Sequence, residues 1–152
     1  MPFDVLEAHC LLPGTSYTEQ GKTVSINRVG DEAIRFFGID NQAFRDHFHV
    51  QQVCDILVEY HNGALAVLLF VELKGGALAT AEQQIRRAIQ AIRSCLKGVW
   101  LQRALIISTG AKANVAAGIQ KRLKRDTNVT AFIKSLPKGT WSLRQPDYLN
   151  PA

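Results

Sequence analysis

The chain has 152 residues, of which 47% are hydrophobic and 20% are charged, and its formal net charge is +5. This composition excludes an intrinsically disordered chain and predicts a single domain with a substantial core, spanning residues 1–152. The excess of Lys and Arg over Asp and Glu favours an anionic partner, with nucleic acid as the first candidate.

The cysteines and the apolar runs indicate the compartment. Cys10, Cys54 and Cys95 form no C-x-x-C pair, and any disulfide scheme would leave one of them unpaired. A reducing cytoplasm is therefore the simpler interpretation. The first residues contain acids and lack the basic start and apolar run of a signal peptide. The longest apolar run, residues 64–71, is too short to cross a bilayer, so we expect no membrane association.

The hydrophobic pattern predicts alternating strands and helices. Residues 3–12 fit a short strand or a short helix, and residues 39–49 have no clear pattern. The other expected elements are a strand at 22–29, a helix at 32–37 ended by Gly38, hairpin strands at 52–60 and 64–73, a helix at 81–97 with Thr80 and Gln83 as a capping box, a strand at 103–108, a helix at 112–125 and a strand at 128–134. This order predicts an α/β protein in which helices flank a mixed sheet.

Charged side chains interrupt the apolar hairpin. Asn62-Gly63 is a strong hairpin signal, and placing these residues at the centre of the turn pairs His61 with Ala64. In that register Asp55 and Glu72 are diagonal neighbours on one face, about 7–8 Å apart. Lys74 follows Glu72 at a period of two and points the same way. Two acids and a lysine beside a buried strand are costly unless they bind something.

Asp55 followed by Glu72-Leu73-Lys74 resembles the D…(D/E)xK signature of the PD-(D/E)xK nuclease superfamily, which includes many restriction endonucleases and archaeal Holliday-junction resolvases. The usual proline before the first acid is replaced here by Cys54. The resemblance implies a restriction-endonuclease-like αβββαβ core, about residues 30–108, with the C-terminal helix and strand as an αβ extension. It also implies a metal-dependent nuclease that hydrolyses phosphodiester bonds, more often in DNA.

The resemblance assigns roles to the motif. Asp55, Glu72 and the backbone carbonyl of Leu73 would hold Mg²⁺ or Mn²⁺, which prefer oxygen ligands. Lys74 would orient the attacking water or stabilise negative charge at phosphorus. The alternative is that Glu72 and Lys74 form a solvated strand end, with Asp55 on an edge strand. Asp55 is followed by an apolar triplet typical of a central strand, which argues against this alternative.

Two further residues are weaker candidates for the same site. Many family members carry a metal-directed glutamate on their first helix, and Glu32 is the best match. It could equally be a first-turn glutamate favoured by the helix dipole. A glutamine also occurs on the helix after the lysine motif in some members, which Gln84 matches, although Ala88 stands where a tyrosine often follows. We expect Gln84 near the catalytic residues.

A basic run, Lys121-Arg122-Leu123-Lys124-Arg125, could be a solvated helix face or could follow DNA phosphates. The chain has no obvious separate recognition domain, so a homodimer or a larger complex is expected. Two alternatives to the nuclease remain open. One is a non-catalytic protein of the same fold that binds nucleic acid or a protein. The other is an unrelated basic α/β interaction protein.

Overall fold

The computed structural model describes residues 3–74, 77–144 and 148–150. Its helices and strands, in chain order, are α1 (Asp4–His9), β1 (Ser16–Glu19), β2 (Lys22–Ser25), β3 (Ala33–Gly38), α2 (Gln42–Phe48), β4 (Ile56–Asn62), β5 (Leu65–Lys74), α3 (Leu78–Arg93), β6 (Leu101–Ser108), α4 (Ala113–Thr127), β7 (Thr130–Ser135) and β8 (Gly139–Ser142). Among the described residues no helix is both long enough and apolar enough to span a bilayer.

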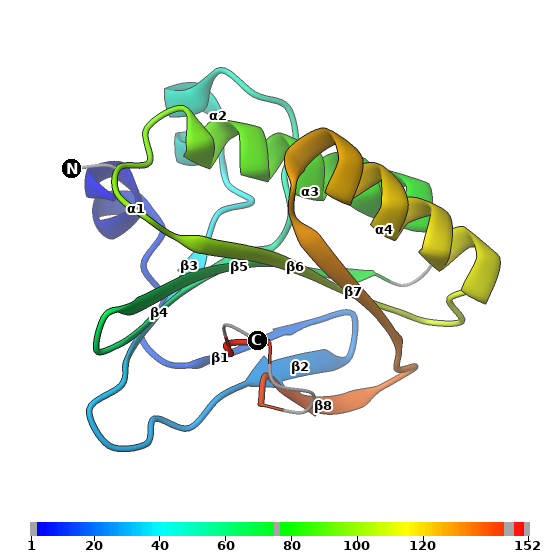
Figure 1. The fold of residues 1–152 in the computed structure, drawn as a ribbon, viewed down its shortest axis with the longest axis horizontal. Helices are drawn as coiled ribbons and strands as arrows, with labels where there is room; N and C mark the ends of the chain where they lie inside the picture. Colours follow the sequence, from blue (N-terminus) through cyan, green and yellow to red (C-terminus); the bar gives the residue numbers. More distant parts are fainter. Residues whose placement is uncertain (1–2, 75–76, 145–147, 151–152) are drawn as a thin grey trace.

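The elements form three layers (Figure 1). The middle layer is a five-stranded sheet of order β3-β4-β5-β6-β7, with antiparallel pairs as far as β5 and parallel pairs beyond it. The helices lie on one face of this sheet, and a three-stranded sheet, β1-β2-β8, lies on the other. In the smaller sheet β1 and β2 are antiparallel, whereas β2 and β8 are parallel. The predicted mixed α/β class is confirmed.

Each face of the large sheet has its own apolar core. On the helix side, Leu57 and Phe70 pack with Ile85 and Ile89 of α3. On the other side, strand residues of the large sheet pack against the small sheet and the C-terminal segment, with Val24 and Tyr148 among the buried contacts. Because side chains alternate between faces along a strand, even the central strands contribute to both cores. The large sheet is therefore buried on both faces.

Several predicted elements are confirmed with shifted ends. The strand predicted at 103–108 is β6, the helix at 112–125 is α4, and the strand at 128–134 is β7. The helix predicted at 81–97 is α3, which begins earlier, at Leu78. The predicted capping box is wrong because the N-cap is Ala77, which offers no side-chain acceptor, and Thr80 already lies within the first helical turn.

The helix predicted at 32–37 is wrong, because β3 occupies this segment and pairs antiparallel with β4. Gly38 accordingly ends a strand and does not cap a helix. Residues Ile34 to Phe37 supply apolar side chains to both faces of the sheet, and this hides the alternation that would have indicated a strand. The helix in this region is α2, inside the segment 39–49 that had no clear pattern.

The predicted hairpin is present, but its register differs. Asn62 pairs with Leu65, so Gly63 and Ala64 are the two turn residues, and Gly63 adopts the positive φ of 59°. His61 therefore pairs with Ala66 and not with Ala64. This is a shift of two residues, and because strand side chains alternate with a period of two, every side chain keeps its predicted face.

Candidate active site

Asp55 and Glu72 lie side by side where the β4–β5 ladder ends. The last paired residues are Ile56 and Val71, and the two acids come next on their respective chains. They are thus directly opposed, and closer than the predicted diagonal arrangement. Their side chains project on the helix side of the sheet, as those of Leu57 and Phe70 do.

Main-chain to side-chain hydrogen bonds continue the pairing beyond the ladder. The backbone N–H of Asp55 donates to Oε1 of Glu72 at 3.1 Å, and the backbone N–H of Leu73 donates to Oδ2 of Asp55 at 2.8 Å. Asp55 is only 9% exposed and Glu72 only 2%. One oxygen of each carboxylate is therefore fixed by the backbone, and the two carboxylates face each other away from bulk water.

This arrangement disfavours two negative charges. Burial raises the pKa of Glu72, and the nearby charge of Asp55 raises it further, while Lys74 acts in the opposite direction. Burial also raises the pKa of Asp55, against the lowering effect of the Leu73 N–H. Two close, buried carboxylates of this kind retain a proton between them unless a cation takes its place.

Lys74 and Gln84 complete the group. Nζ of Lys74 lies 3.5 Å from Oε2 of Glu72 and donates a hydrogen bond of 3.3 Å to Oε1 of Gln84. Gln84 comes from α3 and is only 2% exposed, so the helix holds its amide against the sheet. The structure thus brings Asp55, Glu72, Lys74 and Gln84 together, as the motif predicts.

The oxygen donors at this site suit a small hard cation. In a strand the N–H and C=O of one residue point to the same side, and the N–H of Leu73 points toward Asp55. The Leu73 carbonyl therefore faces the same side, while the next carbonyl, that of Lys74, accepts from Thr109 of the β6 side. Two carboxylates and a carbonyl, supplemented by water and a phosphate, match Mg²⁺ or Mn²⁺. Within the described ranges no group of three or more His, Cys, Asp or Glu side chains is placed to hold a metal ion, so a cation here would take its remaining ligands from the carbonyl, water and a phosphate.

Glu32 lies on the other face of the large sheet. Its carboxylate contacts the Tyr60 hydroxyl and the Arg144 guanidinium and accepts from the Val29 N–H at 2.8 Å. The hydrogen bond from Arg144 is the main reason that the pKa of Glu32 falls to about 2. This corrects the expected placement of Glu32 beside the carboxylate pair: its charge is already balanced, and the helix predicted for it is a strand.

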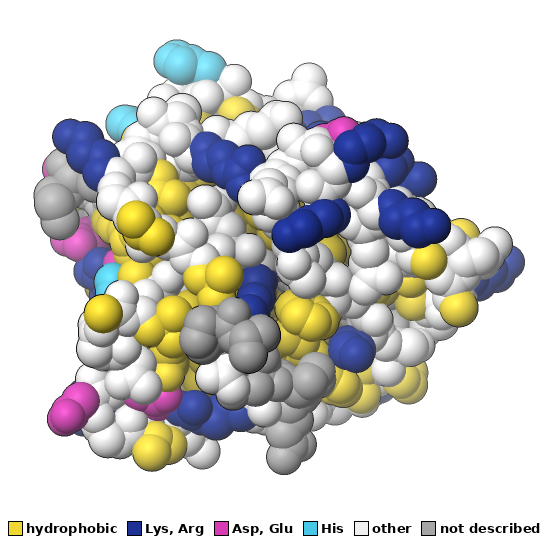
Figure 2. Space-filling model, viewed as in Figure 1, with side chains coloured by type: hydrophobic (Ala, Val, Ile, Leu, Met, Phe, Trp, Pro, Cys, Tyr) yellow, Lys and Arg dark blue, Asp and Glu magenta, His cyan; other side chains and the backbone are white. Residues whose placement is uncertain are grey.

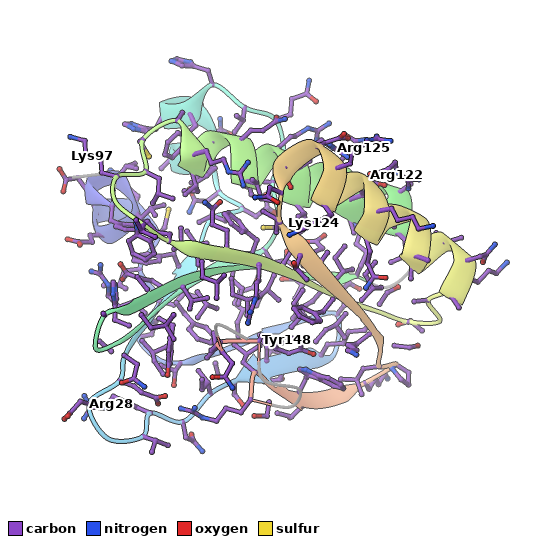
Figure 3. All side chains as sticks on the ribbon, in the orientation of Figure 1. Arg28, Lys97, Arg122, Lys124, Arg125 and Tyr148 are labelled. Atoms are coloured by element: carbon purple, nitrogen blue, oxygen red, sulfur yellow. The ribbon has the colours of Figure 1, made fainter. Side chains whose placement is uncertain are left out.

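The basic run of α4 does not reach the carboxylate pair. Arg122 pairs with Glu82 of α3 at 2.8 Å, and Arg125 pairs with Asp126 at 2.7 Å. Figure 3 shows Lys124 on the side of α4 toward β7, with Arg122 and Arg125 on the side toward α3. Lys121 and Lys124 line a groove beside the start of β7. The acids, by contrast, lie where β5 ends, so the basic run and the carboxylate pair lie at different ends of the sheet, and a role of the run in following DNA phosphates stays a prediction.

Sequence reasoning missed two acids near the pair. The negative charges of Glu19 in β1 and Asp40 both act to raise the pKa of Asp55. Glu19 also accepts a hydrogen bond from the Tyr17 hydroxyl at 2.8 Å. No local motif marks these residues, because they reach this end of the sheet only through the packing of the small sheet and of the loop after β3.

Comparisons with protein-family models, with curated proteins and with solved structures found no significant match to this chain.

Proposed function

We propose that this protein is a Mg²⁺- or Mn²⁺-dependent nuclease of the PD-(D/E)xK type that hydrolyses phosphodiester bonds in DNA. The observation that carries the proposal is the buried pair Asp55 and Glu72, with Lys74 and Gln84 on the same face. The element order also supports it if α1 takes the place of the helix that was wrongly predicted at 32–37, so that the core begins well before residue 30. In that case α1, β3, β4, β5, α3 and β6 follow one another as αβββαβ, with the β1–β2 hairpin and α2 as insertions.

Each side chain has a role in this proposal. Asp55, Glu72 and the Leu73 carbonyl hold the cation. When bound, the cation supplies Lewis acidity and neutralises charge at phosphorus. The Lys74 ammonium group places a positive charge beside the reacting phosphate and can orient the attacking water. Gln84 positions Lys74 by accepting its hydrogen bond.

A second candidate is a non-catalytic protein in which the acids have only a structural role. The reciprocal bonds of Asp55 and Glu72 to the backbone favour it, since they hold the end of the hairpin together. However, Asn and Gln could accept the same two bonds without burying charge. The burial of two acidic side chains where amides would suffice therefore supports a cation site more strongly than a structural one.

The test is a cleavage assay on linear, circular, single-stranded and branched DNA with Mg²⁺ or Mn²⁺. Asp55→Asn and Glu72→Gln keep the backbone bonds and remove the charges, so each should lower the cleavage rate by about 100-fold or more. Asp31→Asn is the matched control, because Asp31 is an exposed acid on a loop. Full activity in the two site variants would refute the proposal, as would a folded parent protein that cleaves none of these substrates.

A further inference from the structure

Two adjoining grooves lie beside β7, far from the carboxylate pair. The first, of about 540 Å³, lies between α4 and β7 and is lined by Gln120, Lys121, Lys124, Arg125, Thr130 and Ala131. The second, of about 460 Å³, crosses the starting ends of β6 and β7 and shares Lys124 and Thr130 with the first. We call the two together the β7 groove.

The β7 groove is strongly cationic. Arg93 and Arg103 line its second part, and none of the described residues that line either part is acidic. The ammonium groups of Lys121 and Lys124 are exposed and make no hydrogen bond or ion pair with the described part of the chain. Figure 2 shows Lys and Arg side chains gathered over α4 on this same face.

One of the arginines that line the groove is buried and hydrogen-bonded. Arg103 is 7% exposed and donates to the carbonyl of Tyr148 at 2.7 Å. Arg93, at the end of α3, donates to the side chain of Gln102 at 3.2 Å. The groove therefore combines one buried guanidinium group, one exposed guanidinium group and two lysines that have no partner of opposite charge among the described residues. Such a surface attracts an extended polyanion.

We propose that the β7 groove binds the sugar–phosphate backbone of DNA, as a second contact that is separate from the carboxylate pair. The inference rests on the proposed function for the identity of the polyanion. An acidic peptide added as a sixth strand fits less well, because Gln120 donates to the outward carbonyl of Ala131 at 3.0 Å and so blocks part of the β7 edge.

The strands give the spacing between the two contacts. Lys74 pairs with Ser108 at one end of β6, and Leu101 at the other end lines the groove. Ser108 and Leu101 are separated along β6 by about 23 Å, at about 3.3 Å per residue. The DNA duplex rises about 3.4 Å per base pair, so the two contacts lie about seven base pairs apart. A duplex must extend at least that far to use both.

The test measures binding without cleavage. The parent protein and the variants are titrated in EDTA with a labelled duplex of about 20 base pairs over a range of salt concentrations, and binding is followed by fluorescence anisotropy. The double variant Lys121→Gln/Lys124→Gln should bind more weakly, and the slope of log affinity against log salt should fall by about two. The matched control is Arg28→Gln/Lys138→Gln, which removes two exposed cations elsewhere and should keep the parent slope.

Three results would overturn the inference: an unchanged slope in the groove variant, an equal loss in the control, or tighter binding of polyglutamate than of DNA. A hairpin duplex of about five base pairs cannot reach both contacts, so a smaller effect of the groove variant on this ligand than on the long duplex is also required. Because these measurements need no metal, they remain informative if the cleavage assay fails. Loss of cleavage in Asp55→Asn with an intact salt slope would support both proposals independently.

Discussion

Glu72→Gln should stabilise the metal-free protein, even though it removes a charge from the proposed active site. The pKa of Glu72 is raised by burial and by Asp55, so its carboxyl is protonated in the folded state at pH values where it is ionised in the unfolded state. Glutamine resembles the protonated acid: it can still accept from the Asp55 N–H, and it can donate to the Asp55 carboxylate.

The size of the effect is set by pH. Keeping a carboxyl group of ordinary pKa 4.5 protonated at pH 7 costs about 1.4 kcal/mol for each of about 2.5 pH units, or about 3–4 kcal/mol. Glutamine avoids this cost. The free energy of unfolding of Glu72→Gln should therefore exceed that of the parent by up to about 3–4 kcal/mol at pH 7. In a protein of this size that corresponds to roughly 6–16 °C in Tm.

The sign of the pH dependence follows from the same shift. Stability that depends on protonated Glu72 is fully present below pH 4.5 and is lost as the pH rises through the raised pKa of the folded state. In urea unfolding in EDTA at several pH values between about 4.5 and 8, the free energy of unfolding of the parent should fall with rising pH relative to that of Glu72→Gln. The two proteins should be nearly equal at the acidic end.

Glu32→Gln is the matched control, because it makes the same substitution at a buried acid of opposite character. The pKa of Glu32 is lowered to about 2, mainly by Arg144, so its carboxylate stabilises the fold above about pH 4.5 and this contribution disappears as the pH falls toward 2. The free energy of unfolding of Glu32→Gln should be about 2–3 kcal/mol lower than that of the parent near neutral pH. If Glu72→Gln is equally destabilising, the carboxylate pair is an ordinary structural element and the reasoning is refuted.

Three further predictions concern the same site. Lys74→Ala should retain divalent-ion binding, measured by calorimetry, while cleavage falls by about 10²–10⁴-fold, because lysine is a donor and not a metal ligand; restoration of its activity by excess metal would reverse the assigned roles. Asp55→Ala should be less stable than Asp55→Asn by about 1–3 kcal/mol in urea unfolding, since it leaves the buried Leu73 N–H without an acceptor; equal stability would contradict this. Mg²⁺ binding at pH 7 should release close to one proton, seen as a dependence of the calorimetric enthalpy on the buffer, and no release would show that the pair holds no proton.

The local chemistry of the hairpin made the central part of the site predictable. Asn62-Gly63 located the turn, and the period-two alternation placed Asp55, Glu72 and Lys74 on one face. The exact register was wrong by two residues because Gly63 and Ala64 form the turn. This error left each side chain on its predicted face of the sheet. It did, however, place the two acids diagonally, whereas they are directly opposed and closer together.

The predictions that were wrong concern residues whose positions depend on contacts distant in sequence. β3 contributes apolar side chains to both cores, so the spacing of its apolar residues could not distinguish a strand from a helix. Glu32 was consequently assigned to a helix and placed on the wrong face of the sheet. Its partner Arg144 is more than a hundred residues away. Likewise, no local pattern shows that the basic end of α4 lies at the opposite end of the sheet from Lys74, because this follows from the direction of the parallel strands.

The parallel pairing of β2 with β8 has a consequence for synthesis on the ribosome. Residues 22–25 pair with residues 139–142, and Tyr148 and Leu149 complete the same apolar cluster. The five strands of the large sheet and its helices can assemble earlier, since the strand pairing of that sheet ends at residue 135. One apolar face of that sheet is therefore exposed to solvent until more than a dozen further residues leave the exit tunnel. Nascent chains arrested in this interval should be a preferred target of chaperones that recognise exposed apolar surface.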